Sequence, residues 1–461
     1  MNDSIGVAAP WYPPRARPCR KPLRFPANLI KLISNNLEFI PEQAYRERMV
    51  IAQGPPRMAF VTDPELVKAL LLSRHSEFPK GRVQVDILKP VFGNAIISSQ
   101  GQQWRWQRGA AAPLFRQEEL LRYGPVMTAA AEATVAKWRA AGSGTVHRID
   151  TDMMRAAFDV ISNTMLVGGA KGVLGAIEKG HADYYRGINW WVIYTLLKLP
   201  HWLPRPRGRA TRAHETRFRN VVAEVVRQQS ADASGGQGLV ARLLRACDPE
   251  TGQGMSEELV IDNVVAFMMA GFDTTALSLA WTLFLISRSP EWEARMLAEI
   301  EQVVGAGPVK SSHVEQLHTV RQVLKESLRL FPTAPIILRD IVNDTEIDGV
   351  TIPAGTIGVI PIYAVHRHRS HWDDPDRFDP SRFSGQRDRD LRFQFMPFGA
   401  GPRICIGAAF AMMEATMMLA TFLRAAHFAV APGFEPQPLG RMFLVARKGL
   451  PMRVTLRQNL S

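Results

Sequence analysis

Cysteine is scarce in this chain of 461 residues, which has only three: Cys19, Cys247 and Cys405. So few thiols over this length argue against a framework of disulfides and fit a protein kept in a reducing compartment. A zinc centre built from several cysteines is also excluded, because no second cysteine lies within usable spacing of Cys405.

Long apolar runs are missing as well. The sequence has no stretch of about 18 uncharged apolar residues, the length needed to cross a bilayer. The first residues contain Asp3 and three prolines, and they lack the apolar centre of a signal peptide. We therefore expect a soluble, cytoplasmic protein without a transmembrane anchor.

Acidic residues are too few to balance the basic ones: 43 Asp and Glu stand against 56 Lys and Arg, a formal net charge of +13. Such an excess suits nucleic acid, an anionic membrane or an acidic protein partner. The basic residues cluster in the first 25 positions and in residues 204–219. Neither cluster has interleaved aromatics or a nucleic-acid-binding module, so we expect no nucleic acid partner.

What the chain does have is ordinary globular composition, with 46% hydrophobic and 21% charged residues. Residues 57–72 predict a strand and then a helix capped near Asp63, and helical patterning dominates to Leu330. Beyond Pro332, "TEIDGVTIPAGTIGVI" predicts a hairpin around Asp348-Gly349. We predict a mainly α fold with a minor β portion (α+β), with a Pro/Arg-rich tail over 1–25 and one domain over 26–461.

One predicted helix is unusually long and contains an unusual segment. It begins after Ser256, a good N-cap, and ends at Pro290, about 33 residues or roughly 50 Å. Inside it lies "AGFDTT" (270–275), where glycine, aspartate and threonines are poor helix formers. The segment is either a tolerated kink with satisfied side chains or an opening where Asp273 and a threonine reach a ligand or water.

Two pairs of polar residues share helix faces. Glu326 and Arg329 in "KESLRLFP" are three apart, which alone predicts only a weak surface ion pair. Trp104 and Arg108 in "GQQWRWQR" are four apart. They are either an aromatic contact beside a solvated arginine or two donors for carboxylates.

Cys405 lies in "FGAGPRICIG", between glycines and directly before a predicted helix. It could be an inert buried thiol, the commonest fate of a free cysteine. The histidine-rich "HRHRSH" (366–371) is an unattractive cation site because arginines separate its histidines. A thiolate on haem iron would account for the glycines, for Arg403 as a carboxylate partner and for the helix N-terminus that follows.

These residues resemble the cytochrome P450 family. "FGAGPRICIG" is similar to its haem-thiolate signature at every fixed position, and "AGFDTT" resembles its oxygen-activation motif in a long central helix. "ESLR" resembles the family's E-x-x-R pair, "PDRF" (375–378) its arginine-bearing segment, and "WRWQR" its W-x-x-x-R helix. The five motifs occur in the family order. The resemblance implies a cytochrome P450 fold, with the long helix over haem and small β-sheets.

The resemblance also implies roles for individual residues. Cys405 would be the proximal iron ligand of haem b, and Thr274 would hydrogen-bond dioxygen while Asp273 supplies protons through water. Glu326, Arg329 and Arg377 would form a structural triad. Further cofactor-binding residues implied by the motifs are Trp104, Arg108, Ala270, Gly271, Arg339, Phe398, Arg403 and Gly407.

The implied reaction inserts one oxygen atom into an organic substrate, with electrons ultimately from NAD(P)H. No fused reductase fits in the chain, so we expect a separate electron donor of the ferredoxin or flavodoxin type, together with its reductase. Such donors are commonly acidic, which suits the net positive charge of this chain. Its docking face would surround the Cys405 loop. A peroxide-driven peroxygenase and a non-catalytic haem protein are alternatives; the intact Asp273-Thr274 pair argues against both.

The family's substrate-contact regions fall on apolar segments of this sequence. We therefore expect a hydrophobic substrate: a fatty acid, terpenoid, steroid or polycyclic compound. The aromatic segment 188–203 is a lid, core packing or a surface-binding element. The candidate pocket residues are Val83, Ile96, Ile97, Trp190, Phe267, Ala334, Ile336, Phe443 and Leu444.

Overall fold

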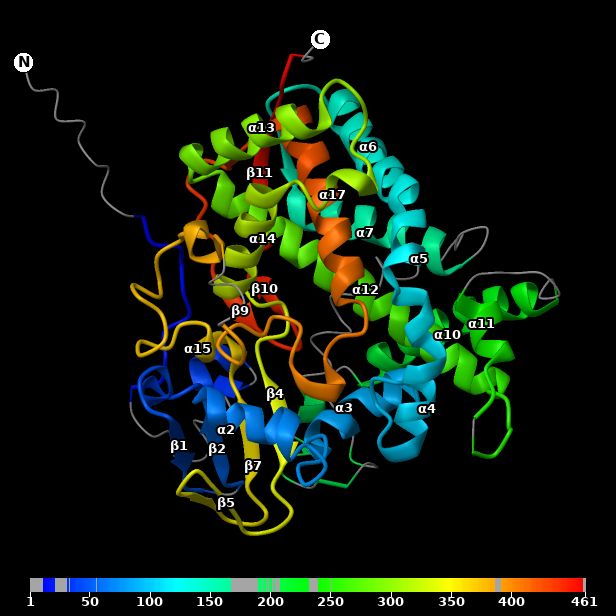
Figure 1. Cartoon of the computed structure of the whole chain (residues 1–461), viewed down its shortest axis with the longest axis vertical. Coiled ribbons are helices and arrows are strands. Elements are labelled where there is room, and N and C mark those ends of the chain that lie inside the picture. Colours follow the sequence, from blue (N-terminus) through cyan, green and yellow to red (C-terminus); the bar gives the residue numbers. More distant parts are fainter. Residues whose placement is uncertain are drawn as a thin grey trace, which may run out of the picture.

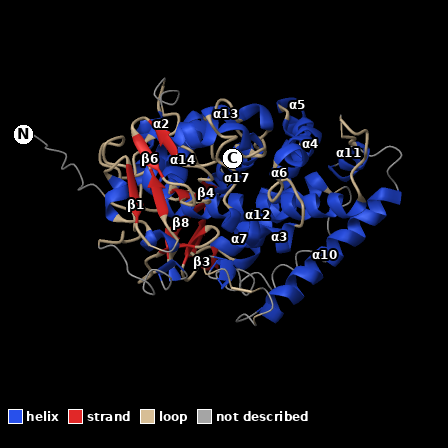
Figure 2. Ribbon diagram, turned by 90° about the horizontal axis from the view of Figure 1, so that it is seen from below, coloured by secondary structure: helices blue, strands red, loops and turns tan. Residues whose placement is uncertain are grey.

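The computed structural model describes residues 11–20, 31–32, 34–54, 56–166, 208–231, 239–248, 250–385 and 391–458, with nine more positions between 190 and 203. Helices dominate and the strands gather at one side (Figures 1 and 2). The helices of five residues or more are α2 (Pro64–Lys68), α3 (Arg82–Phe92), α4 (Gly101–Ala111), α5 (Gln117–Arg122), α6 (Gly124–Ala141), α7 (Ile149–Met165), α10 (Gly208–Ala231), α11 (Leu239–Arg245), α12 (Glu257–Ile286), α13 (Pro290–Val304), α14 (His318–Leu330) and α17 (Ala408–Ala425).

The strands form four small sheets in the described chain. Their bounds are β1 (Met49–Ala52), β2 (Met58–Val61), β3 (Thr145–Arg148), β4 (Ile337–Asp340), β5 (Thr345–Ile347), β6 (Val350–Ile352), β7 (Ile357–Ile360), β8 (Ala426–Val430), β9 (Pro438–Gly440), β10 (Leu444–Ala446) and β11 (Pro451–Leu456). The sheet orders are β1-β2-β7-β4, β3-β11-β8, β9-β10 and β5-β6.

Local signals read from the sequence correspond to observed elements. Asp63 caps α2 by accepting from the amides of Glu65 and Leu66, directly after β2. Strands β5 and β6 pair as the predicted hairpin, with Asp348 (φ 50°) and Gly349 (φ 73°) both in the left-handed region that a type I′ turn requires. The mainly α architecture with a minor β portion is therefore observed as predicted.

Helix α12 runs through the centre of the molecule beside α17 (Figure 1). The Ser256 hydroxyl caps it by accepting from the Leu259 amide at 3.2 Å. Residues 257–286 form one continuous α-helix, so the segment 270–275 does not interrupt it. Gly271 has a packing role instead: a Cβ there would lie 2.6 Å from Cδ1 of Ile161 on α7. Glycine thus lets α7 and α12, the most extensively packed helix pair, approach closely.

Helices α12 and α17 are long and apolar enough to cross a membrane by length and composition alone. However, 72% and 61% of their most apolar windows are buried inside the protein. Core helices of this kind pass the same composition test, so their apolar side chains are accounted for by contacts within the fold. Thr274 on α12 and Cys405 in the loop before α17 both line one cavity.

Candidate active site

Cys405 lies in the loop that leads into α17, and backbone geometry fixes this loop tightly. The Cys405 amide donates to the Phe398 carbonyl at 2.9 Å. Gly401 has φ 72°, and a Cβ there would lie 1.8 Å from the carbonyl oxygen of Leu71. Only glycine fits this position, so the loop cannot relax away from the cavity without losing its contact with the 64–73 helical segment.

The thiol of Cys405 is accessible, but it faces an internal cavity of about 370 Å³ rather than the outer surface. Burial raises the pKa of the Cys405 thiol. A hydrogen bond from the Gly407 amide and the Arg108 charge act in the opposite direction. Gly407 is the N-cap of α17, so the helix N-terminus favours negative charge at the sulfur. Phe398, Gly407, Ala270 and Gly271 line the same cavity.

Helix α12 forms part of the wall of the cavity that Cys405 lines. Thr274 lines the cavity, and its hydroxyl donates to the Ala270 carbonyl one turn earlier at 2.7 Å. Asp273 is buried, with 4% of its surface exposed, but it is not among the residues that line the described cavity. The structure therefore brings Thr274 and Cys405 into the lining of one cavity, whereas Asp273 is buried outside this lining.

Four cations line this cavity close to one another. Arg403 lies 4.4 Å and Arg108 5.8 Å from the centre of the Trp104 ring, and Lys80 is bridged to Arg339 through the backbone. Their hydrogen-bond partners are backbone carbonyls: Lys80 donates to Ile97, Arg339 to Leu338 at 2.8 Å, and Arg403 to Ser99 at 3.2 Å. All three arginines and Trp104 were predicted to bind the cofactor.

Burial lowers the pKa of all four cations. The pKa of Lys80 falls to about 7, with the Arg403 and Arg339 charges adding to the effect, and that of Arg339 falls to about 10. The pKa values of Arg403 and Arg108 are also lowered. No carboxylate in the described part of the chain acts on the pKa of any of the four. Lys80 and Arg339 are buried and Arg108 and Arg403 are half-buried, and cations in such surroundings without a counter-charge indicate a site for an anionic ligand.

These residues fit haem. Its two propionate carboxylates would supply the negative counter-charge that the described chain does not provide for the four cations. A thiolate such as that of Cys405 is an established ligand of haem iron. Lys80 was missed by the sequence reasoning. No motif marks it, because it reaches the cavity only through the contact of its loop with β4; a Cβ on Gly81 would lie 2.7 Å from Leu338 Cβ.

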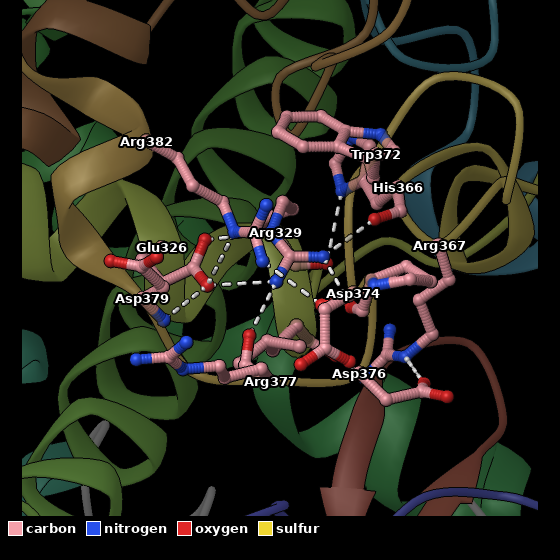
Figure 3. A network of polar contacts seen from close by, with 12 residues as sticks. Glu326, Arg329, His366, Arg367, Trp372, Asp374, Asp376, Arg377, Asp379 and Arg382 are labelled. Atoms are coloured by element: carbon pink, nitrogen blue, oxygen red, sulfur yellow. Dashed lines mark hydrogen bonds and ion pairs between the residues drawn. The ribbon is translucent and has the colours of Figure 1, made fainter. Parts of the chain in front are cut away.

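A second charged cluster, centred on Glu326 and Arg329 of α14, is fully buried (Figure 3). Arg329 forms two parallel hydrogen bonds to Glu326, at 2.6 and 2.7 Å. Its remaining N–H groups donate to the carbonyls of His366, Pro375 and Arg377 at 2.6–3.0 Å. The pair is thus far stronger than the surface ion pair that its spacing alone predicts.

The predicted third member of this triad is wrong. Arg377 is exposed and contributes its backbone carbonyl, whereas the guanidinium beside Glu326 belongs to Arg382, with Nε 3.7 Å from Oε1 (Figure 3). Arg382 lies on a 3₁₀ turn, Pro380–Phe383, which Asp379 caps. The sequence contains "PDRF" and "PSRF" five residues apart. An aspartate precedes the proline of both motifs, so no local pattern in the sequence selects the second one.

The apolar lining only partly matches the predicted pocket. Ile96, Ile97, Phe267, Ala334 and Phe443 line the cavity. Val83, Trp190, Ile336 and Leu444 do not; Leu444, for example, is fully buried and its carbonyl accepts from Trp281. Most of segment 188–203 lies outside the described residues. Lining residues missed by the sequence reasoning, which no local motif marks, include Phe92, Phe115, Ile161, Met165, Met269 and Met442.

A buried carboxyl adjoins the α12 wall and was also missed. Glu414 of α17 accepts a hydrogen bond from Thr275 at 3.1 Å, and its other oxygen has no partner in the described structure. Burial raises the pKa of Glu414 to about 8, while the Thr275 hydrogen bond acts to lower it. The carboxyl therefore holds a proton at neutral pH.

Comparison with known proteins finds a family model, relatives and a solved structure that are similar to this chain. A family model described as "Cytochrome P450" matches residues 23–455. Cyclooctat-9-en-7-ol 5-monooxygenase of Streptomyces melanosporofaciens is 30% identical over 90% of this chain and 86% of its own. Pentalenene oxygenase of Streptomyces avermitilis is 29% identical over 95% and 94%. The crystal structure of the cytochrome P450DA heme domain superposes with a TM-score of 0.82 at 25% identity, covering 97% of this chain and 99% of that one.

Proposed function

The chain belongs to the cytochrome P450 family and is a haem-thiolate monooxygenase, and we propose that it oxidises a neutral cyclic hydrocarbon or alcohol of the terpenoid class. The substrate class is inferred from the distribution of charged side chains in the cavity lining. Its charged side chains are the four cations, two of which flank Trp104, whereas residues 266–271 of α12 and Phe92, Ile96 and Ile97 line it with apolar surface.

In this proposal the two propionates of haem would form ion pairs with the four clustered cations. The remaining lining then offers no cation to the carboxylate of a fatty acid, and burying an unpaired carboxylate is costly. Side chains such as Phe92, Phe267 and Met269 instead supply apolar surface that suits a neutral ring system. The names of the two Streptomyces relatives, which specify pentalenene and cyclooctat-9-en-7-ol, support this choice.

The residues would act as follows. Cys405 Sγ would bind the iron, held in place by the Phe398 carbonyl and the Gly407 amide. Lys80, Arg108, Arg339 and Arg403 would bind the propionates. Haem supplies the activation of dioxygen and the transfer of one oxygen atom to the substrate. Thr274 donates its hydroxyl proton to the Ala270 carbonyl, which leaves its oxygen free to accept a hydrogen bond from a group bound in the cavity, and Asp273 would supply protons through water.

We further propose that electrons come from NAD(P)H through a separate acidic ferredoxin or flavodoxin, in a cytoplasmic protein. Ile404, one residue before Cys405, has 41% of its surface exposed, and the exposed Arg105 lies on α4 between the cavity-lining Trp104 and Arg108. An acidic protein docked over this face would approach the sulfur closely. Its binding should weaken steeply with ionic strength.

The test compares ligands of equal carbon number on the holoenzyme. Pentalenene should shift the haem spin state at lower concentration than pentadecanoic acid, and Thr274→Ala should leave that binding intact while releasing peroxide instead of product. Tighter binding of the fatty acid would contradict the substrate class. Unchanged coupling in Thr274→Ala would contradict the proton role alone.

A further inference from the structure

A second, polar cavity of about 580 Å³ lies under the N-terminal strap, which we define as residues 11–20. It shares no lining residue with the haem cavity. Its other walls come from residues 42–45 and from the segment 363–376 that leads into the Glu326–Arg329 cluster. The proposed monooxygenase chemistry makes no use of it.

The strap is held in place at several points, so this cavity has defined walls. Tyr12 donates to Asp374 at 3.0 Å, and Arg15 is paired with Asp376. The Ala16 amide donates to the Tyr363 hydroxyl at 3.1 Å, and the Cys19 amide donates to the Ile40 carbonyl at 3.0 Å. The basic residues of this stretch are therefore positioned against the fold.

Cations outnumber carboxylates around the cavity. The carboxylates are Asp376, shared by Arg15 and by Arg367 at 3.5 Å, and Glu42, 4.0 Å from Arg20. Within the described chain, Arg17, Lys31 and Arg369 have no carboxylate partner. The six cations in the lining are Arg15, Arg17, Arg20, Lys31, Arg367 and Arg369.

Two buried donors in this lining have no hydrogen-bond partner in the described structure. Arg367, with 3% of its surface exposed, lies with its guanidinium 3.9 Å from the centre of the Tyr363 ring, and its Nη1 is unpartnered. The Tyr45 hydroxyl is buried and also unpartnered. Leaving a buried donor unsatisfied is unfavourable, so both groups lack an acceptor that a ligand could supply.

We propose that this cavity binds a small soluble molecule through a phosphate or diphosphate group. Arg17, Lys31 and Arg369 would neutralise its charge, while Arg367 Nη1 and the Tyr45 hydroxyl, both closed off from solvent in this structure, would turn toward its oxygens and donate to them. A phosphate group is favoured over a single carboxylate because it offers more charge and more acceptor oxygens, which match several guanidinium donors.

The experiment titrates inorganic pyrophosphate into the holoenzyme by calorimetry, at constant ionic strength and without phosphate in the buffer. The test variant is R17Q/R369Q, which removes two exposed charges at the cavity. The matched control is R57Q/R453Q, which removes two exposed arginines elsewhere and lowers the net charge equally. Y45F removes only the buried hydroxyl. Haem absorption checks that every variant is folded.

Saturable binding at one site is expected, weakened at least about tenfold in R17Q/R369Q and several-fold in Y45F, but by less than about twofold in the control. Equal weakening in both arginine pairs would show that only overall charge matters. No binding at millimolar pyrophosphate, or binding to phosphatidic acid vesicles but not to pyrophosphate, would also overturn the proposal.

Discussion

The molecule has two buried clusters of charge that differ in how they are neutralised. At Glu326–Arg329, chain atoms satisfy the charges: a carboxylate faces the guanidinium, and three carbonyls accept the remaining N–H groups. Around Trp104, four cations line a cavity and the described chain provides no carboxylate for them. The first cluster is therefore structural, and the second is a binding site.

A substitution that breaks the Glu326–Arg329 cluster should cause the largest loss of stability. Glu326→Gln removes the negative charge and leaves Arg329 buried without compensation, so we expect a loss of about 3–5 kcal/mol in the free energy of unfolding. Chemical denaturation of the holoenzyme measures it. Glu291→Gln, which breaks the exposed Arg295–Glu291 pair, is the control and should cost less than about 0.5 kcal/mol. Similar losses in both variants would mean that burial is unimportant.

The two arginines near this cluster should differ in their effect on stability, and only that of Arg382 should be intermediate. Arg382→Gln removes a mostly buried guanidinium that faces Glu326 and donates to the Asp374 carbonyl, and it should cost about 1–3 kcal/mol. Arg377→Gln alters an exposed side chain and keeps the carbonyl that Arg329 uses, so it should cost less than about 0.5 kcal/mol. Denaturation curves that rank the two variants in the opposite order would restore the original assignment.

At the four cations around Trp104, a substitution should weaken the retention of haem rather than the stability of the polypeptide fold. Lys80→Met should release haem to an acceptor protein about tenfold faster near pH 7, since one charge-assisted contact is lost. In the haem-free fold the pKa of Lys80 is lowered to about 7 from its usual 10.5, so above pH 7 most of its charge is absent before haem binds. Binding then requires proton uptake.

The difference in haem affinity between the wild type and Lys80→Met should therefore narrow as the pH rises from 7 to 9. Lys68→Met, an exposed lysine paired with Glu65, is the control and should not change haem release. A pH-independent difference would mean that Lys80 is already charged in the haem-free protein.

The same contrast explains what the sequence could predict. The caps at Asp63 and Ser256, the Asp348-Gly349 turn and the Cys405 loop depend on neighbours in the chain, so their residue patterns are informative. Lys80, Arg382 and Glu414 acquire their roles through tertiary contacts, which no local pattern encodes. Gly271 shows the intermediate case: its motif was recognised, but the physical reason for glycine, contact with Ile161, lies on another helix.

We infer that Cys405 presents a thiolate to haem in the cavity that the four cations line. The most direct test is the absorption spectrum of the reduced, carbon-monoxide-bound protein. We predict the long-wavelength Soret band characteristic of thiolate ligation, and its loss in Cys405→His with haem still bound. A Soret band at the shorter wavelength typical of histidine-ligated haem in the unaltered protein would contradict the account.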